Sequence, residues 1–275
     1  MSLDKDPVLS ELYRTFISGC HILHYQGVLD AYGHLSVRHP NDPKKFIMSQ
    51  YIAPGTISSR VDLIEYWVEN AEPVDPTAAK GYSERCIHSE VLKRFPEVNS
   101  VIHSHSEAVV PYSISGVPLK ACYHMGGFLG TKTPVYDNAN YVRAGVDVPD
   151  MLIRNTHLGG ALASHFTDSE SGTSPDYAVV LMRGHGLTVL APTIQDCVLR
   201  AVYTQKNAAI QTTSLLTHAA YFGSSGTPTS SRPEIKYLSE DESSATLEMT
   251  RWSAMRPWGL WLREVEATGL YVNRG

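Results

Sequence analysis

The chain has 275 residues, of which 43% are hydrophobic and 19% charged, and 23 Lys and Arg against 28 Asp and Glu give a formal net charge of −5. This length predicts one large domain with an appendage, and the composition excludes collagen-like, coiled-coil and wholly disordered proteins. Without a broad basic field, nucleic acid and anionic membranes are poor candidates for partners, and a small-molecule substrate is the better expectation.

The cysteines and the N-terminal residues bear on where the protein works. The four cysteines are distant from one another in sequence and form no CxxC motif, which argues against a zinc ribbon or a disulfide scaffold and predicts reduced thiols. The first fifteen residues contain no apolar core of a secretory signal, and no stretch approaches the roughly 18 apolar residues of a membrane span. We therefore expect a cytoplasmic protein.

Hydrophobic spacing and turn residues predict the elements in chain order. Asp6 and Pro7 suit the start of a helix that Gly27 ends, and Ser83 suits the cap of a later helix. The predicted helices are 7–27, 84–95, one starting at 106, 148–166 and 193–222, and the predicted strands are 34–38, 45–49, 61–68, 98–103, 177–183 and 187–190. This alternation predicts a layered α/β domain over residues 1–222.

The C-terminal part has a different composition. Residues 223–234 are rich in Gly, Ser, Thr and Pro, as in a linker. The tail that follows, 235–275, contains Trp252, Trp258 and Trp261. Three indoles in ten residues need a surface that buries them, and we expect that surface to be a neighbouring subunit or the active-site rim of the same domain.

Two histidines, His103 and His105, follow the apolar run that ends the strand predicted at 98–103. If the strand continues through both, its two-residue period places both imidazoles on one face, about 7 Å apart along the chain, where they can chelate one cation. Because the chain has 12 histidines, such a pair also arises by chance. Its position at the end of a buried strand, where open α/β sheets place ligand sites, favours the functional interpretation.

His185 and Glu84 are further candidates. Gly184 and Gly186 flank His185 and allow either a close approach of ligand to backbone or a tight hairpin with an exposed histidine at its tip. Glu84 opens a predicted helix, where it is either a carboxylate favoured by the helix dipole or an acid/base directed at a metal. A metal on three neutral imidazoles keeps its charge and acts as a Lewis acid, while a nearby carboxylate transfers the proton.

The order GHLSVR, GYSERCIHSEVLKRFPEVNSVIHSHS and MRGHGL resembles the class II aldolase/adducin family over about residues 8–222, with a pattern closest to its L-fuculose-phosphate aldolases. The resemblance implies a three-layer α/β/α sandwich around a mostly antiparallel sheet, and a homotetramer with sites at subunit interfaces. It also implies a divalent metal, usually Zn²⁺ with Mn²⁺ or Fe²⁺ possible, held by His103, His105 and His185, with Glu84 as the acid/base.

This chain departs from the sugar-phosphate members where they bind phosphate and where they place a catalytic tyrosine. The resemblance carries their three phosphate loops onto Gly33 and His34, Gly55 and Thr56, and Tyr82 and Ser83. An imidazole replaces an amide at His34 and a phenol replaces a hydroxyl at Tyr82, which weakens the predicted phosphate site. The family's catalytic tyrosine falls near Tyr123 and His124, where His124 is a proton-transfer group, a fourth metal ligand or a core residue.

The resemblance leaves three functions open. We rank first a class II aldehyde-lyase that cleaves a ketose phosphate such as L-fuculose 1-phosphate through a metal-stabilised enediolate, with Glu84 moving the proton and His124 or Tyr123 serving the leaving aldehyde. The alternative is a metal-dependent decarboxylase of an aromatic or sugar acid, which the aromatic replacements in the phosphate loops favour. We rank a non-catalytic interaction module third, because such a module would not need the three histidines and Glu84 that the chain retains.

Overall fold

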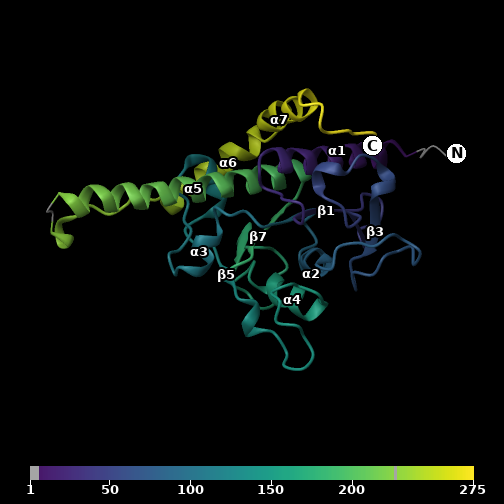
Figure 1. Ribbon diagram of the computed structural model, residues 1–275, viewed down its shortest axis with the longest axis horizontal. Coiled ribbons are helices and arrows are strands. Elements are labelled where there is room, and N and C mark those ends of the chain that lie inside the picture. The colour runs from purple at the N-terminus through teal and green to yellow at the C-terminus, as the bar shows by residue number, and fades with distance from the viewer. Residues whose placement is uncertain (1–5, 226–227) are drawn as a thin grey trace.

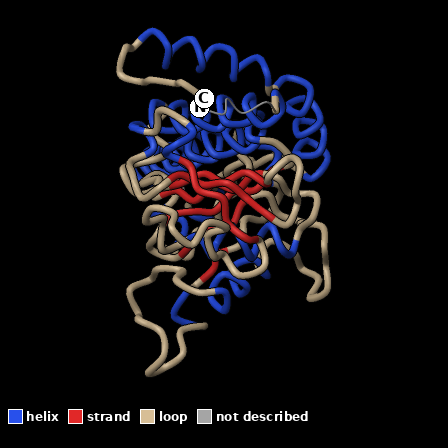
Figure 2. The backbone as a smooth tube through the Cα atoms, turned by 90° about the vertical axis from the view of Figure 1, so that its right-hand side faces the viewer, coloured by secondary structure: helices blue, strands red, loops and turns tan. Residues whose placement is uncertain are grey.

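The computed structural model describes residues 6–225 and 228–275, in which a seven-stranded sheet lies between two layers of helices (Figures 1 and 2). Helices α1 (Pro7–Tyr25) and α5 (Ile194–Ser224) cover one face, and α2 (Arg85–Arg94) and α4 (Thr156–Ser164) cover the other. The remaining α-helices are α3 (Val110–Ile114), α6 (Glu240–Ser253) and α7 (Met255–Ala267). The predicted three-layer sandwich is thereby confirmed.

The sheet has the order β3-β2-β1-β4-β7-β6-β5. Its strands are β1 (His34–Arg38), β2 (Lys45–Ser49), β3 (Leu63–Trp67), β4 (Ser100–Ser104), β5 (Val135–Tyr136), β6 (Val179–Met182) and β7 (Gly186–Ala191). Every pairing is antiparallel except that of β5 with β6. His103 on the central strand β4 lies opposite His34 on β1 and Thr188 on β7. His103 therefore lies on the central strand of the sheet, next to His34 on the neighbouring strand.

Alternating side chains divide the interior into two cores. Ile47 on β2 packs in the core beneath α1 and α5, whereas its neighbours Phe46 and Met48 pack in the core beneath α2 and α4. All three are at most 1% exposed. Burying a side chain of this size stabilises the fold by about 1.5–3 kcal/mol, so the two-residue alternation fixes which face each strand presents to which helices.

Local signals placed several element boundaries well. The Asp6 side chain accepts hydrogen bonds from the backbone N–H groups of Val8 and Leu9, which caps α1. Gly27 follows the helix with a φ of 68°, a left-handed conformation that glycine adopts without strain. The strands predicted at 34–38 and 45–49 have the same bounds in the structure as β1 and β2.

Three predicted features are wrong in detail. The residue that caps α2 is Glu84, not Ser83, and its side chain makes no capping bond because it is turned toward another loop. The helix expected over 148–166 begins only at Thr156, because Met151 adopts a left-handed φ of 69° and the Asn155 side chain caps the later start. The helix expected from residue 106 is only α3, which Gly116 follows with a φ of 77°.

The C-terminal helices add an outer layer. Helix α6 packs on the 3₁₀ helix His124–Leu129, and α7 packs on α1 and α5, with Trp258 and Trp261 buried there. The side chain of Trp252 and residues 226–227 of the predicted linker lie outside the described residues, and α5 extends into that linker as far as Ser224. The C-terminal half of α5 projects beyond the body (Figure 1). Among the described helices, none is both long and apolar enough to cross a membrane.

Candidate active site

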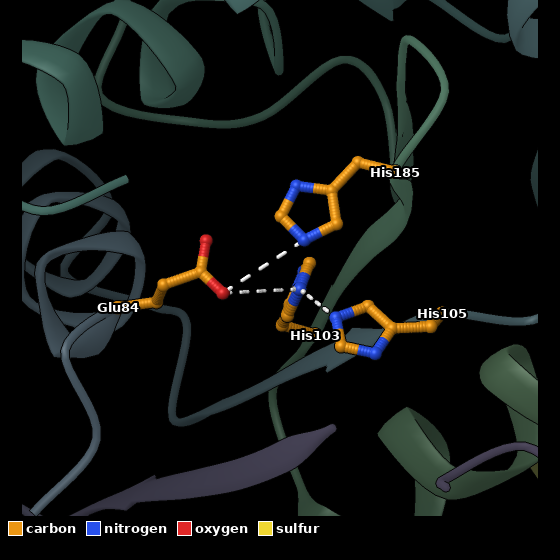
Figure 3. A group of neighbouring side chains, drawn as sticks. All are labelled: Glu84, His103, His105 and His185. Carbon is orange, nitrogen blue, oxygen red and sulfur yellow. Dashed lines mark hydrogen bonds and ion pairs between the residues drawn. The ribbon is translucent and has the colours of Figure 1, made fainter. Parts of the chain in front are cut away.

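Four side chains from three separate regions of the chain meet at one end of the central strands (Figure 3). Glu84 stands at the start of α2, His103 lies in β4, and His105 follows the end of that strand. His185 comes from the turn between β6 and β7. One potential ligand atom from each residue lies within 4.8 Å of the other three.

The distances define where these atoms point. The Nε2 atoms of His103 and His105 are 3.2 Å apart. Glu84 Oε2 lies 3.7 Å from His103 Nε2 and 3.8 Å from His185 Nε2. Figure 3 shows these three nitrogens and the carboxylate oxygen facing one another. His103 is fully buried, and the side chains of Glu84 and His185 are only 8% and 11% exposed.

The turn that carries His185 depends on its two glycines. Gly184 has a φ of 63° and Gly186 a φ of 150°, both disfavoured for other residues. A Cβ at Gly186 would lie 2.0 Å from the carbonyl oxygen of Ser104, so only glycine lets β7 approach β4 this closely. The structure has the hairpin that the glycines suggested, but its histidine turns inward rather than into solvent.

A loop remote in sequence holds Glu84. The backbone N–H of Ile153 donates to Glu84 Oε1 over 3.0 Å, which leaves Oε2 directed at the histidines. Burial raises the pKa of Glu84 to about 7, although the hydrogen bond from the Ile153 N–H opposes that shift. In the cluster without a bound cation, this carboxyl group can therefore carry or accept a proton near neutral pH.

Asp30 orients His105. Its Oδ2 lies 3.0 Å from His105 Nδ1, and its Oδ1 accepts hydrogen bonds from the backbone N–H groups of Tyr32 and Gly33. Burial raises the pKa of Asp30, but these hydrogen bonds outweigh it and lower the pKa below its usual value. An ionised carboxylate accepts the Nδ1–H of His105, so the lone pair of His105 Nε2 faces the cluster.

The donor set fits a divalent metal ion. Burial lowers the pKa of His185 to about 4 and that of His103 well below its usual value, so both rings are neutral and offer lone pairs. Glu84 Oε2 lies farther from the nitrogens of His103 and His185 than a hydrogen bond allows, although buried polar groups are normally hydrogen-bonded. This spacing suits a metal ion between the oxygen and the nitrogens. Two nitrogens on one tetrahedral zinc lie about 3.3 Å apart, close to the separation of the His103 and His105 nitrogens.

A cavity of about 280 Å³ opens beside this cluster, and one side of it is an aromatic wall of His34, Tyr82 and Tyr51. The ring centres of His34 and Tyr82 are 4.6 Å apart, and those of Tyr82 and Tyr51 are 5.4 Å apart. The Tyr82 hydroxyl donates to the carbonyl of Ile52, so mainly the ring is available to a ligand. Among its described lining residues, the cavity has no Lys or Arg.

A buried hydrogen-bonded chain supports this wall. His34 Nδ1 lies 2.7 Å from His88 Nε2, and His88 Nδ1 lies 2.7 Å from the Ser36 hydroxyl. All three side chains are buried, and burial lowers the pKa of His88 to about 3, so its ring is neutral. These two hydrogen bonds fix the orientation of the His34 ring, and Nε2 is its remaining hydrogen-bonding atom.

The other residues predicted for the site are only partly brought together. Ser83 lines the cavity. Gly33 comes directly before His34 in the sequence and lies close to the His103 carbonyl. Gly55 instead packs against the His24 ring of α1, and the Thr56 hydroxyl donates to Ala53. Tyr123 contacts His124 and Tyr203 of α5, on the side of the tail helices. These last four predicted residues do not line this cavity.

Sequence reasoning missed several contributors. Asp30, His88 and Tyr51 were not singled out, and neither was the backbone of Ile153. Each acts through a contact with residues 30 to 80 positions away, for which no local motif exists. The available signal was the short D-x-x-G turn at Asp30, where an acidic side chain commonly accepts backbone N–H groups.

Fold and cluster define the class of protein. The model of the class II aldolase and adducin N-terminal domain matches residues 14–212, and the chain belongs to this family. Its curated relatives include the decarboxylase tropJ of Talaromyces stipitatus, 52% identical over 94% of this chain and 96% of that protein. A 3,4-dihydroxyphthalate decarboxylase of Arthrobacter keyseri is 26% identical over 71% of this chain and 76% of its own length.

Solved structures agree on the fold. An L-fuculose 1-phosphate aldolase from Glaciozyma antarctica superposes with a TM-score of 0.68 at 18% identity, covering 95% of this chain and 90% of that one. An aldolase II superfamily protein from Pseudomonas syringae gives 0.69 at 16% identity, covering 97% and 96%. At such identities the likeness concerns the fold alone. The protein is an enzyme, and its relatives favour the decarboxylase alternative over the aldolase reaction ranked first from sequence.

Proposed function

We propose that the protein is a metal-dependent decarboxylase of a hydroxylated aromatic acid. The observation that carries this proposal is the aromatic wall of His34, Tyr82 and Tyr51 beside the cluster of one carboxylate and three imidazoles. A flat ring packs well against such a wall, whereas a phosphate would find the Tyr82 ring in place of the hydroxyl that the family resemblance implies, with the Tyr82 hydroxyl already bound to the carbonyl of Ile52. The relatives whose names describe decarboxylases support the same choice.

His103, His105 and His185 would hold the ion, with zinc the leading candidate and Mn²⁺ or Fe²⁺ compatible with imidazole ligands. When bound, it supplies a Lewis acid that draws electron density from a substrate oxygen. The wall orients the ring, and the His34 Nε2 atom is placed to hydrogen-bond a substrate oxygen.

Glu84 carries the proton in this mechanism. The bond between the ring carbon and the carboxylate carbon breaks, CO₂ leaves, and the electron pair stays on the ring carbon. The Glu84 carboxyl group then donates its proton to that carbon and is reprotonated from solvent. The Ile153 N–H, by holding Oε1, keeps the other oxygen aimed at the reacting atom.

The test is a substrate panel on the metal-loaded full chain. Release of CO₂ from hydroxylated benzoates or phthalates, lost on chelation and restored by added metal, is the expected result. Aldehyde release from L-fuculose 1-phosphate without CO₂ from any aromatic acid would overturn the proposal. The homotetramer with sites at subunit interfaces and the cytoplasmic location belong to the same proposal, and light scattering of the purified protein tests the assembly.

A further inference from the structure

The buried chain of His34, His88 and Ser36 behind the aromatic wall determines where the hydrogens of its two imidazoles lie. Ser36 in β1 and His88 in α2 are both 0% exposed, while His34 is 2% exposed and lines the cavity. The chain therefore runs from the core of the domain to the candidate site. Each of its two contacts is 2.7 Å long, so each needs one hydrogen and one lone pair between its atoms.

The Ser36 hydroxyl sets the direction of these hydrogen bonds. In the part of the chain that the structure describes, the Ser36 oxygen has a single hydrogen-bond partner, the Nδ1 atom of His88. Because a buried hydroxyl hydrogen without an acceptor is unfavourable, the Ser36 O–H donates to His88 Nδ1. That atom then supplies a lone pair, and the hydrogen of the His88 ring lies on Nε2.

The next contact carries the same direction to His34. His88 Nε2 bears a hydrogen and lies 2.7 Å from His34 Nδ1, so His34 Nδ1 must accept it. The hydrogen of the His34 ring is therefore on Nε2. This Nε2 atom has no hydrogen-bond partner among the described residues, and His34 is part of the cavity lining. His34 thus presents an N–H group to a ligand.

The opposite direction would give His34 a different role. If His34 Nδ1 donated to His88, His34 Nε2 would hold a lone pair and could act as a base or as a metal ligand. The Ser36 hydroxyl would then accept from His88 and leave its own hydrogen without an acceptor among residues 6–225 and 228–275. Because the ring centres of His34 and His103 are 5.1 Å apart, this choice decides whether a fourth imidazole lone pair lies beside the cluster.

Resting on the function proposed above, we propose that Ser36 and His88 are positioning residues that make His34 a hydrogen-bond donor to a substrate oxygen. Such a donor favours an ionised phenol or carboxylate oxygen, because charge-assisted hydrogen bonds are about twice as strong as neutral ones. It also keeps His34 out of the ligand set of the metal, since a protonated Nε2 has no lone pair to offer. The site therefore selects ligands that place a hydrogen-bond acceptor against the wall.

The first experiment is solid-state NMR of the zinc-loaded full chain with isotope-labelled histidine, which reports the nitrogen that carries the hydrogen in each ring. Loss of signals in His34→Gln and His88→Gln assigns the two rings. We expect hydrogen on Nε2 of both rings in the wild type and in Ser36→Thr, which keeps the hydroxyl. In Ser36→Ala, a share of both rings should carry it on Nδ1. Hydrogen on His34 Nδ1 in the wild type overturns the proposal, and unchanged rings in Ser36→Ala overturn the role of Ser36.

The second experiment measures binding of 2,3-dihydroxybenzoate to the same zinc-loaded chain by calorimetry. His34→Phe keeps an aromatic ring against Tyr82 but removes the N–H group, so we expect Kd to rise about tenfold. His34→Gln, whose amide can supply an N–H group, should recover part of this loss. Ser36→Ala should raise Kd about twofold if the two forms of His34 become equally populated, and Ser36→Thr should not. His218→Phe is the control, since His218 is exposed on α5 and outside the cavity lining.

Together the two experiments separate this proposal from the proposed function. If His34 carries its hydrogen on Nε2 and His34→Phe weakens binding, while no hydroxylated aromatic acid releases CO₂, the donor role stands and the decarboxylase function is wrong. A wild type that does not bind 2,3-dihydroxybenzoate, or binds it no more tightly than His34→Phe does, overturns the donor role even if CO₂ is released. Circular dichroism establishes that the variants compared are folded.

Discussion

Asp30→Asn tests how the cluster prepares its metal ligands, because it changes a proton rather than a shape. In the wild type, Asp30 Oδ1 accepts from the N–H groups of Tyr32 and Gly33, while Oδ2 accepts from His105 Nδ1. An asparagine keeps its oxygen for the two backbone donors and turns its NH₂ group toward His105. The asparagine NH₂ group and the Nδ1–H of His105 then face each other as two donors. His105 relieves this by moving its proton to Nε2, the atom whose lone pair would bind the metal.

The size of the effect follows from this geometry. The Asp30 side chain is 47% exposed, so loss of its charge alone is screened by solvent and contributes little. The unfavourable tautomer is the larger effect, and losing such a partner lowers metal affinity about 10- to 100-fold, or roughly 1.4–2.7 kcal/mol. The fold should change little, because the loop keeps both backbone hydrogen bonds.

The assay is calorimetric titration of the metal-free full chain with Zn²⁺, against a competing chelator. Asp168→Asn is the matched control, since Asp168 is an exposed carboxylate that pairs with Lys132 and Tyr177 away from the cluster. Circular dichroism and thermal unfolding check that both variants are folded. A folded Asp30→Asn protein that binds zinc within about twofold of the wild type would refute the argument from tautomers.

Three further predictions concern Glu84, Gly186 and His88. Glu84→Gln keeps the shape but has no proton to transfer at this position, so kcat should fall about 10²- to 10⁴-fold with one equivalent of metal still bound, as measured by turnover and metal analysis. Gly186→Ala forces a Cβ against the Ser104 carbonyl, and urea unfolding should show a loss of at least about 3 kcal/mol; an unchanged midpoint would contradict the close approach. The folded-state pKa of His88, about 3, lies below its unfolded value of 6.5, so its contribution to stability is complete above about pH 6.5 and is lost as the pH falls toward 3. His88→Gln should therefore flatten the fall in unfolding free energy between pH 6 and pH 4 by up to about 1.4 kcal/mol per pH unit, and parallel curves would count against a buried neutral ring.

Local patterns predicted the parts of the fold that depend on local physics. Alternation along β1 and β2 placed both strands, since each side chain must enter one of two cores. The family resemblance added the assembly of Glu84 with three histidines, which distances in the sequence alone do not reveal. Its assignment of Gly55 and Thr56 to substrate binding stays a prediction, because Gly55 packs against α1 and Tyr51 of the same loop lines this cavity.

There is a physical reason why the contacts of Asp30 and Ile153 with the cluster could not be predicted from the sequence. Asp30 is 75 residues from His105, and Ile153 is 69 residues from Glu84. Such pairs depend on how two loops end, to within an ångström, after the sheet has set its register. Neither contact requires a particular residue pattern along the chain, and the Ile153 contact uses a backbone N–H that every residue except proline carries.

The choice between the two lyase reactions therefore lies in the surroundings of the cluster rather than in the cluster itself. Three imidazoles and a carboxylate can serve either reaction, because both leave an electron pair on carbon that a Lewis acid stabilises and a carboxyl group protonates. What differs is the recognition of the rest of the substrate. A sugar phosphate needs hydroxyl, amide or backbone N–H donors around its phosphate, whereas the cavity beside the cluster offers the rings of His34, Tyr82 and Tyr51. The His34 ring is hydrogen-bonded to His88, which is hydrogen-bonded in turn to Ser36, so buried residues of the domain fix the position of this part of the wall.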